Sequence, residues 1–414
     1  MTESSNVLDR RGFLVQAAGA ATAVAIMPVL GAMPRLAETL PVVLVGAGRQ
    51  GRAILTELDK FAGAHVSVAA IVDTDKSRLD GAVRRVQGAQ GFASHGEAIE
   101  KLGFPGAWIV ATPTHTHRAI ATDLLAANKN VYCETPLAHT EEDARAILDA
   151  ARKSSGVFVP ALEGRCNPIY RLARTFFRSD SVRDLISMRA QSHQKTSWRT
   201  PASDPSREKA LNWRLDKDLS LGLPGEIGMH QFDVFCWYRD SYPTSVRASG
   251  GVLFHKDGRE VADTISCDFA WDDGTRLHYD ATLANSYQGK HEILHGSNAA
   301  IKLAWSHGWM FKESDAPTQG WEVYANRQQF HNDEGITLIA DATKLASQGK
   351  LKEGVGLPNP PLYYALEEFI KACGAGAKPA VTPEHGYRAT LLGILAQRAL
   401  VTGDTIRITK EMLA

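Results

Sequence analysis

A glycine-rich hexapeptide is the first group of residues whose types and spacing can do chemistry. It reads Gly46-Ala47-Gly48-Arg49-Gln50-Gly51, follows a short run of β-branched residues and precedes a segment with helical spacing. In such a strand–turn–helix the first glycine permits a tight turn, the second admits a pyrophosphate, and the third allows close packing of helix and strand. The helix N-terminus then directs N–H groups and a positive dipole at the phosphates. The motif therefore predicts a dinucleotide site.

An aspartate at the end of the second predicted strand extends this site. Asp73 follows the last glycine by about 20 residues, where a carboxylate accepts hydrogen bonds from the adenosine ribose. No arginine stands directly beside Asp73 to receive a 2′-phosphate, although Lys76 and Arg78 follow closely. The pattern favours NAD, with NADP as the alternative.

The candidate for proton transfer is His230. Removal of hydride from a secondary alcohol needs a base for the hydroxyl proton, and imidazole titrates in the range that suits this task. His230 closes the glycine-bounded segment Gly225–His230, which also holds Glu226. That carboxylate either orients the imidazole or binds a sugar hydroxyl, or it is only a solvated group at a helix start.

Polar residues at two further strand ends are candidates for cofactor contacts. Thr112 and Pro113 follow one predicted strand and Glu134 follows the next, and ligands collect at such ends of a parallel sheet. His117 is expected mainly to begin the helix that follows Pro113.

Trp213 and Arg214 form an aromatic and cationic pair in the second half of the chain. The ring can stack on a sugar, and the guanidinium can bind a cofactor phosphate or a substrate oxygen. The alternative is a packed tryptophan beside a solvated arginine.

The composition excludes several classes of partner. The 414 residues contain 46 Lys and Arg and 46 Asp and Glu, so nothing in the net charge favours nucleic acid. Five scattered cysteines form no CxxC pair, which argues against a disulfide framework or a zinc site and predicts buried free thiols. We therefore expect a small-molecule partner and no metal.

The elements that must position these residues change character near Arg165. Before it, strands and helices alternate, which predicts a doubly wound parallel sheet. After it, alternating apolar runs with Asp-Gly turns predict an antiparallel sheet. The predicted fold is α/β, with a dinucleotide-binding domain over residues 38–164 and a second domain over 165–414. The predicted strands cover residues 41–45, 66–72, 107–111, 130–133 and 157–161, then 251–255, 264–269 and 276–280.

The first 37 residues are typical of a twin-arginine export signal. Arg10 and Arg11 are followed by Phe-Leu and a weakly apolar run of Ala and Gly from Phe13 to Met33. Because that route carries folded proteins, we expect a periplasmic or cell-envelope enzyme without stable membrane insertion. The alternative is a buried N-terminal helix.

From Pro41 onward, the order and spacing of the motifs resemble the glucose-fructose oxidoreductase, inositol dehydrogenase and rhizopine catabolism (Gfo/Idh/MocA) family. The resemblance implies a Rossmann domain, a second domain with a large open sheet that joins subunits into a homo-oligomer, a nicotinamide cofactor, and sugar or polyol substrates. It also places Glu134 beside the nicotinamide ribose and Arg165 in the cleft, where an ion-pair role is the alternative. The motifs that carry it are Gly46–Gly51, Ala111-Thr112-Pro113 with His117, Glu134-Thr135-Pro136, Arg165 with Pro168, Trp213-Arg214 and Gly225–His230.

Two departures from the family pattern bear on the chemistry. The lysine of its Glu-Lys-Pro motif is replaced by Thr135, whose hydroxyl donates a hydrogen bond but carries no charge. The aspartate four residues before the histidine is replaced by Glu226. We expect His230, Glu226 and Thr135 to act in catalysis.

A second group of polar and aromatic residues is a candidate for substrate binding. His193, Lys195 and Trp198 form a cluster whose lysine is a candidate replacement for the missing one. Members without the lysine include the NAD-dependent glycosidases of glycoside hydrolase family 109. The sequence thus favours a carbohydrate oxidoreductase, with an NAD-dependent glycosidase and a non-catalytic sugar-binding protein as alternatives.

Overall fold

The computed structural model describes residues 38–414, except 105, 203, 321, 323–324, 331–332, 341–344, 346–347 and 349–354. The segment 1–37, where we expect the export signal, lies outside the described residues. In the part that is described, no helix combines the length and apolar character needed to cross a membrane.

A six-stranded parallel sheet occupies the first part of the described chain, in the order β3-β2-β1-β4-β5-β6. Its central strands are buried runs of Val, Ile and Leu, as expected for a sheet with helices on both faces. Successive strands are added on one side of β1 up to β3 and on its other side from β4 onward. Ligands bind at the carboxyl ends of the strands where the strand order reverses in this way. The strands are β1 (Leu40–Val45), β2 (Val66–Val72), β3 (Gln90–Phe92), β4 (Ala107–Val110), β5 (Asn130–Cys133) and β6 (Phe158–Pro160). The helices are α2 (Arg49–Asp59), α3 (Lys76–Arg85), α4 (His95–Lys101), α5 (His117–Ala126) and α6 (Glu141–Lys153), with the turn η1 (Thr114–Thr116).

A ten-stranded, mainly antiparallel sheet follows, in the order β14-β15-β13-β12-β11-β7-β10-β9-β8-β16, with β7 and β10 parallel. Burial alternates along β10 and β12, so one face of the sheet packs on helices and the other is open. The strands are β7 (Leu185–His193), β8 (Ser245–Gly251), β9 (Thr264–Ala270), β10 (Arg276–Thr282), β11 (Lys290–Gly296), β12 (Ala299–Ala304), β13 (His307–Lys312), β14 (Arg327–Gln329), β15 (Glu334–Thr337) and β16 (Ile406–Arg407).

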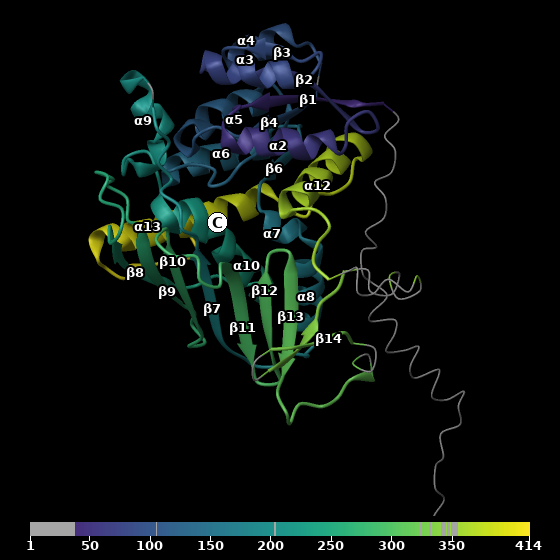
Figure 1. Ribbon diagram of the computed structural model, residues 1–414, viewed down its shortest axis with the longest axis vertical. Coiled ribbons are helices and arrows are strands. Elements are labelled where there is room, and N and C mark those ends of the chain that lie inside the picture. Colours follow the sequence, from purple (N-terminus) through teal and green to yellow (C-terminus); the bar gives the residue numbers. More distant parts are fainter. Residues whose placement is uncertain are drawn as a thin grey trace, which may run out of the picture.

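Helices of the second half cover one face of this sheet and join it to the first (Figure 1). The two C-terminal helices run between the two sheets: α13 packs on α6, β6 and β8, and α12 packs on α2 and α7. The helices are α7 (Glu163–Cys166), α8 (Pro168–Arg178), α9 (Glu208–Leu211), α10 (Met229–Arg239), α12 (Pro361–Ala375) and α13 (Pro383–Thr402), with the short turns η2 (Pro205–Arg207), η3 (Trp213–Leu215) and η4 (Pro224–Gly228). The structure confirms the predicted α/β class with a parallel and a mainly antiparallel sheet.

Candidate active site

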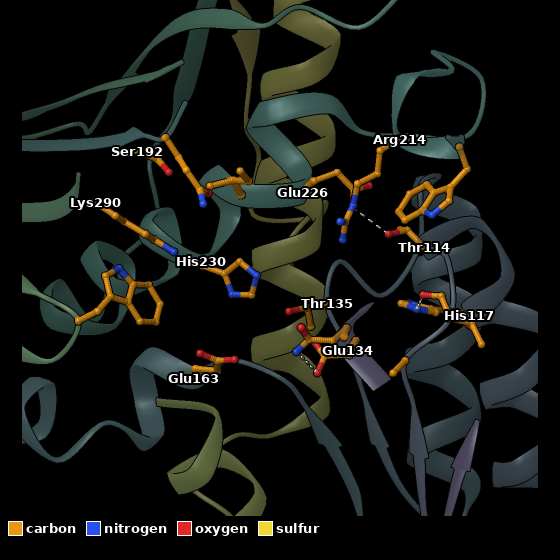
Figure 2. Close-up of a pocket in the computed structure, with 17 residues that line it drawn as sticks. Thr114, His117, Glu134, Thr135, Glu163, Ser192, Arg214, Glu226, His230 and Lys290 are labelled. Atoms are coloured by element: carbon orange, nitrogen blue, oxygen red, sulfur yellow. Dashed lines mark hydrogen bonds and ion pairs between the residues drawn. The ribbon is translucent and has the colours of Figure 1, made fainter. Parts of the chain in front are cut away.

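A cavity of about 310 Å³ opens where the carboxyl ends of the parallel strands face the second sheet. One wall comes from the first sheet and carries Thr112, Glu134 and Thr135. The facing wall comes from α10 and β11 and carries His230 and Lys290 (Figure 2). Residues far apart in sequence therefore share one site at the topological switch point of the parallel sheet.

The glycine-rich turn has the geometry that a pyrophosphate requires. A Cβ atom on Gly51 would lie 1.9 Å from the carbonyl oxygen of Gly46, so only glycine lets α2 start this close to β1. No side chain caps the N-terminus of α2 at Gly48, which leaves that end to an anionic group. Arg49 adds positive charge, and its pKa is lowered by burial and by the nearby Arg214. These residues fit the phosphates of a dinucleotide.

The carboxylate of Asp73 holds the turn in place. It accepts hydrogen bonds from the Ala47 N–H and the Asp75 N–H, each at 2.8 Å. It thus connects the end of β2 to the glycine-rich turn at the edge where the adenosine ribose is expected.

Glu134 lies at the end of β5 and faces the cavity. Gln50, from the glycine-rich motif, donates a hydrogen bond to it at 3.1 Å. Burial raises the pKa of Glu134 to about 8, and the negative charge of Glu163 adds to the rise. This carboxyl group is therefore largely protonated at neutral pH and can both donate and accept hydrogen bonds.

Two other predicted residues of this wall are tied to the backbone. Thr135 donates its hydroxyl to the carbonyl of Ala161 at 3.0 Å. The two ring nitrogens of His117 lie 3.0 and 2.9 Å from the carbonyl oxygens of Pro136 and Thr112, and burial lowers the pKa of His117 to about 4. His117 begins α5, as predicted, and its ring fixes the turns on both sides of it. Pro113 directly precedes the turn η1.

His230 lies in the first turn of α10, directly after η4. Its Nδ1 has no hydrogen-bond partner among the described residues. Burial, together with the positive charge of Lys290, lowers the pKa of His230 to about 3. The imidazole is therefore neutral at physiological pH.

Glu226 is engaged away from His230. It accepts a hydrogen bond from the Thr114 hydroxyl at 3.2 Å and lies 3.6 Å from Nε of Arg214. Burial raises the pKa of Glu226, while Arg214 opposes the rise. Among the described residues, no hydrogen bond joins Glu226 to His230. The expectation that Glu226 orients the imidazole is therefore not what the structure shows; its partner is the arginine.

Trp213 and Arg214 both line the cavity from η3. The guanidinium carbon of Arg214 lies 5.1 Å from the centre of the Trp213 ring and 5.8 Å from that of Trp198. Trp198 thus packs near the guanidinium group of Arg214 and is not among the residues that line the cavity.

Three residues proposed for substrate binding lie elsewhere. Arg165 forms a double hydrogen bond with Asp233, each at 2.8 Å, and both side chains are less than 5% exposed. A guanidinium buried this deeply needs a paired carboxylate, so the ion-pair alternative holds and the cleft assignment fails. His193 pairs with Asp280, and Lys195 lies 5.7 Å from the centre of the Phe254 ring; neither lines the cavity.

The structure adds cavity residues that the sequence did not reveal. They are Glu163, Ser192, Gln194, Lys290 and Trp305. Glu163 follows β6 and could have been found by the strand-end rule that identified Glu134. Lys290 begins β11, and Trp305 follows the end of β12. No local sequence pattern predicts that either residue reaches the cavity.

The fold and the glycine-rich site together define a nucleotide-binding protein of the Rossmann type. A family model described as "Oxidoreductase family, NAD-binding Rossmann fold" matches residues 40–161, and the GFO/IDH/MocA C-terminal domain model matches residues 170–302. Together they span more than half of the sequence, and the chain belongs to the Gfo/Idh/MocA oxidoreductase family with an NAD-binding first domain.

Named relatives fall in the same family. Levoglucosan dehydrogenase of Pseudarthrobacter phenanthrenivorans is 31% identical over 126 residues, which are 30% of each chain. The match thus spans about a third of that relative's length. Inositol 2-dehydrogenase of Rhizobium meliloti is 22% identical over 378 residues, 88% of this chain and 98% of the relative. A solved levoglucosan dehydrogenase in complex with NADH and levoglucosan has the same fold, with a TM-score of 0.70 at 20% identity over 90% of this chain and all of the other.

Proposed function

We propose that the protein is an NAD-dependent dehydrogenase that oxidises a secondary alcohol carbon of a sugar or polyol. The observation that carries the proposal is the neutral, unpartnered imidazole of His230, which faces the strand-end carboxyl of Glu134 across the cavity. The bound dinucleotide supplies the hydride acceptor.

The residues of the cavity divide the remaining work. His230 accepts the hydroxyl proton of the substrate, since its ring is neutral and lines the cavity. Gln50 and Glu134 hold the cofactor side of the cavity at the end of β5. Arg214, which pairs with Glu226, adds a positive charge to the wall of the cavity.

The lining favours a polyhydroxylated substrate. The carboxyl groups of Glu163 and Glu226 can accept hydrogen bonds from hydroxyl groups, and Trp213 and Trp305 add aromatic rings to the lining. The names of the relatives, levoglucosan dehydrogenase and inositol 2-dehydrogenase, support the same substrate class.

Reduced cofactor and sugar products should be followed together to test this proposal. Purified protein is incubated with NAD⁺ and a panel of cyclic polyols, sugars and aryl glycosides. We expect NADH in a 1:1 ratio to a ketone product. Aglycone release without net NADH would replace the proposal with a glycosidase, and binding without turnover would replace it with a sugar-binding protein.

We also propose export by the twin-arginine route and assembly into a homo-oligomer through the open face of the second sheet. The pair Arg10-Arg11 before an apolar run supports the first proposal. The polar and partly exposed outer face of β10 supports the second. Replacement of both arginines by lysine should retain the protein in the cytoplasm, and sedimentation should give a mass above that of one chain.

A further inference from the structure

A lysine that the sequence analysis did not single out enters the cavity from the second sheet. Lys290 is the first residue of β11, and it lies on the helix-covered face of the sheet together with the buried Glu292. Figure 2 shows its amino group directed toward the imidazole of His230, with the carboxyl of Glu163 nearby.

The ammonium of Lys290 lacks the partners of a structural lysine. Its close contact is the ring of Trp305, whose centre lies 3.7 Å from Nζ, and among the described residues no carboxylate or carbonyl accepts a hydrogen bond from it. Lys312 of the same sheet shows the contrast, since its amino group donates to Glu322 at 2.6 Å and to the Pro317 carbonyl at 2.7 Å. Lys290 therefore keeps its N–H donors for a molecule in the cavity.

Charged groups on several elements face Lys290. Burial lowers its pKa to about 8, while the carboxylates of Glu292 and Glu163 oppose the fall. The Tyr170 hydroxyl donates to one carboxyl oxygen of Glu292 at 2.5 Å, and the other oxygen has no hydrogen-bond partner among the described residues. His230 faces Lys290 from α10 as a neutral ring. Lys290 is consequently a cation at neutral pH whose charge is only partly balanced.

We propose that Lys290 is a catalytic residue that donates a hydrogen bond to the reacting oxygen and stabilises the negative charge that develops on it. The inference rests on the proposed function. In the step, the O–H proton of the substrate passes to His230, and the carbon releases its hydrogen together with the C–H electron pair as hydride, which a bound NAD⁺ would accept. The carbon–oxygen bond becomes a carbonyl, and His230 then releases its proton to water.

This role explains how a histidine of low basicity can work in this site. An imidazole with a pKa of about 3 is a weak acceptor for a proton from an alcohol. A neighbouring ammonium lowers the pKa of a bound hydroxyl by favouring its anionic form. Lys290 thus makes the substrate more acidic and at the same time keeps His230 in its neutral form.

The test compares Lys290→Met and Lys290→Arg with the wild-type enzyme, using the best substrate of the panel. Methionine keeps a similar length and can still pack on Trp305 but removes the charge. We expect Lys290→Met to lower kcat/KM by roughly 100- to 1000-fold, the cost of losing one donor to a developing oxyanion, with NADH affinity unchanged. Lys371→Met is the matched control, because that lysine of α12 pairs with Glu367 outside the cavity.

Two further readouts separate catalysis from folding. The kcat/KM of the wild type should fall above pH 8, as Lys290 loses its proton, and Lys290→Arg should abolish this fall. A fall caused by Glu134, whose pKa is also raised to about 8, would persist in Lys290→Arg. NMR titration of His230 without cofactor should show a higher pKa in Lys290→Met than in the wild type.

Different outcomes separate the two proposals. An active wild type together with a fully active Lys290→Met would overturn the role of Lys290 and leave the dehydrogenase proposal standing. An unchanged His230 titration in a folded Lys290→Met would also overturn it. A wild type that binds NADH but oxidises nothing in the panel would overturn the proposed function and the inference with it.

Discussion

At the scale of single residues, the proposed activity depends on the imidazole of His230, which lines the cavity and whose Nδ1 has no hydrogen-bond partner among the described residues. Most buried ring nitrogens find a hydrogen bond, and a group left alone at the edge of a cavity is available to a ligand. His230 meets this description, whereas His117 has both nitrogens at carbonyl oxygens. The two histidines of the cavity therefore differ: His117 holds a turn, and His230 is the residue that we propose as the base.

The replacement His230→Ala tests this assignment. Because a general base contributes roughly 100- to 10,000-fold to the rate, the variant should lose that much in kcat. The affinity for NADH, measured by fluorescence titration, should stay the same, since the phosphate end of the site lies at α2. A fully active variant would remove His230 from the mechanism.

At the scale of elements, the close approach of α2 to β1 makes the third glycine indispensable. A Cβ atom on Gly51 would overlap the Gly46 carbonyl oxygen, so Gly51→Ala must displace the turn. We expect a loss of about 1–3 kcal/mol in unfolding free energy from overpacking, together with weaker NADH binding. Gly96→Ala in α4 is the control, because a Cβ atom there meets nothing within 4 Å and the variant should bind NADH normally.

The short helix α7 and the long helix α10 are joined by the buried pair of Arg165 and Asp233. Removal of one partner leaves an unpaired buried charge, so Arg165→Met should lower the unfolding free energy by about 3–5 kcal/mol. Arg178→Met is the control, since Arg178 and Asp240 form an exposed pair that is worth at most about 1 kcal/mol. Chemical denaturation measures both; equal losses would contradict this role of Arg165.

The sequence predicted those parts of the site that follow from local rules. Strand ends in a parallel sheet meet at one edge, and this rule predicts Glu134 and Thr112 as cavity residues. The glycine-rich motif predicts the phosphate site at the N-terminus of α2. Lys290 and Trp305 could not be found in this way, because they reach the cavity through the pairing of β11 with β7 and β12. Arg165 follows a buried strand, which is where a ligand-binding residue is expected. Its role as an ion-pair partner could not be predicted, because Asp233 lies 68 positions away in the sequence.

At the scale of the whole molecule, the site exists only because two sheets are held face to face. The helix α13 contacts both, and the Leu137 N–H donates to the Thr390 hydroxyl at 2.9 Å across that contact. The catalytic groups of the second half are thereby placed opposite the strand ends of the first. From this arrangement we infer that hydride leaves a carbohydrate carbon in the space between the two sheets.

The most direct measurement follows that hydride. The protein is given NAD⁺ and its best substrate with deuterium on the carbon to be oxidised, and the reduced cofactor and products are analysed by mass spectrometry. The account predicts one deuterium in each reduced cofactor, one ketone for each, and almost no product from His230→Ala. Reduced cofactor without deuterium, or a sugar released with its deuterium retained and no net reduction, would contradict it.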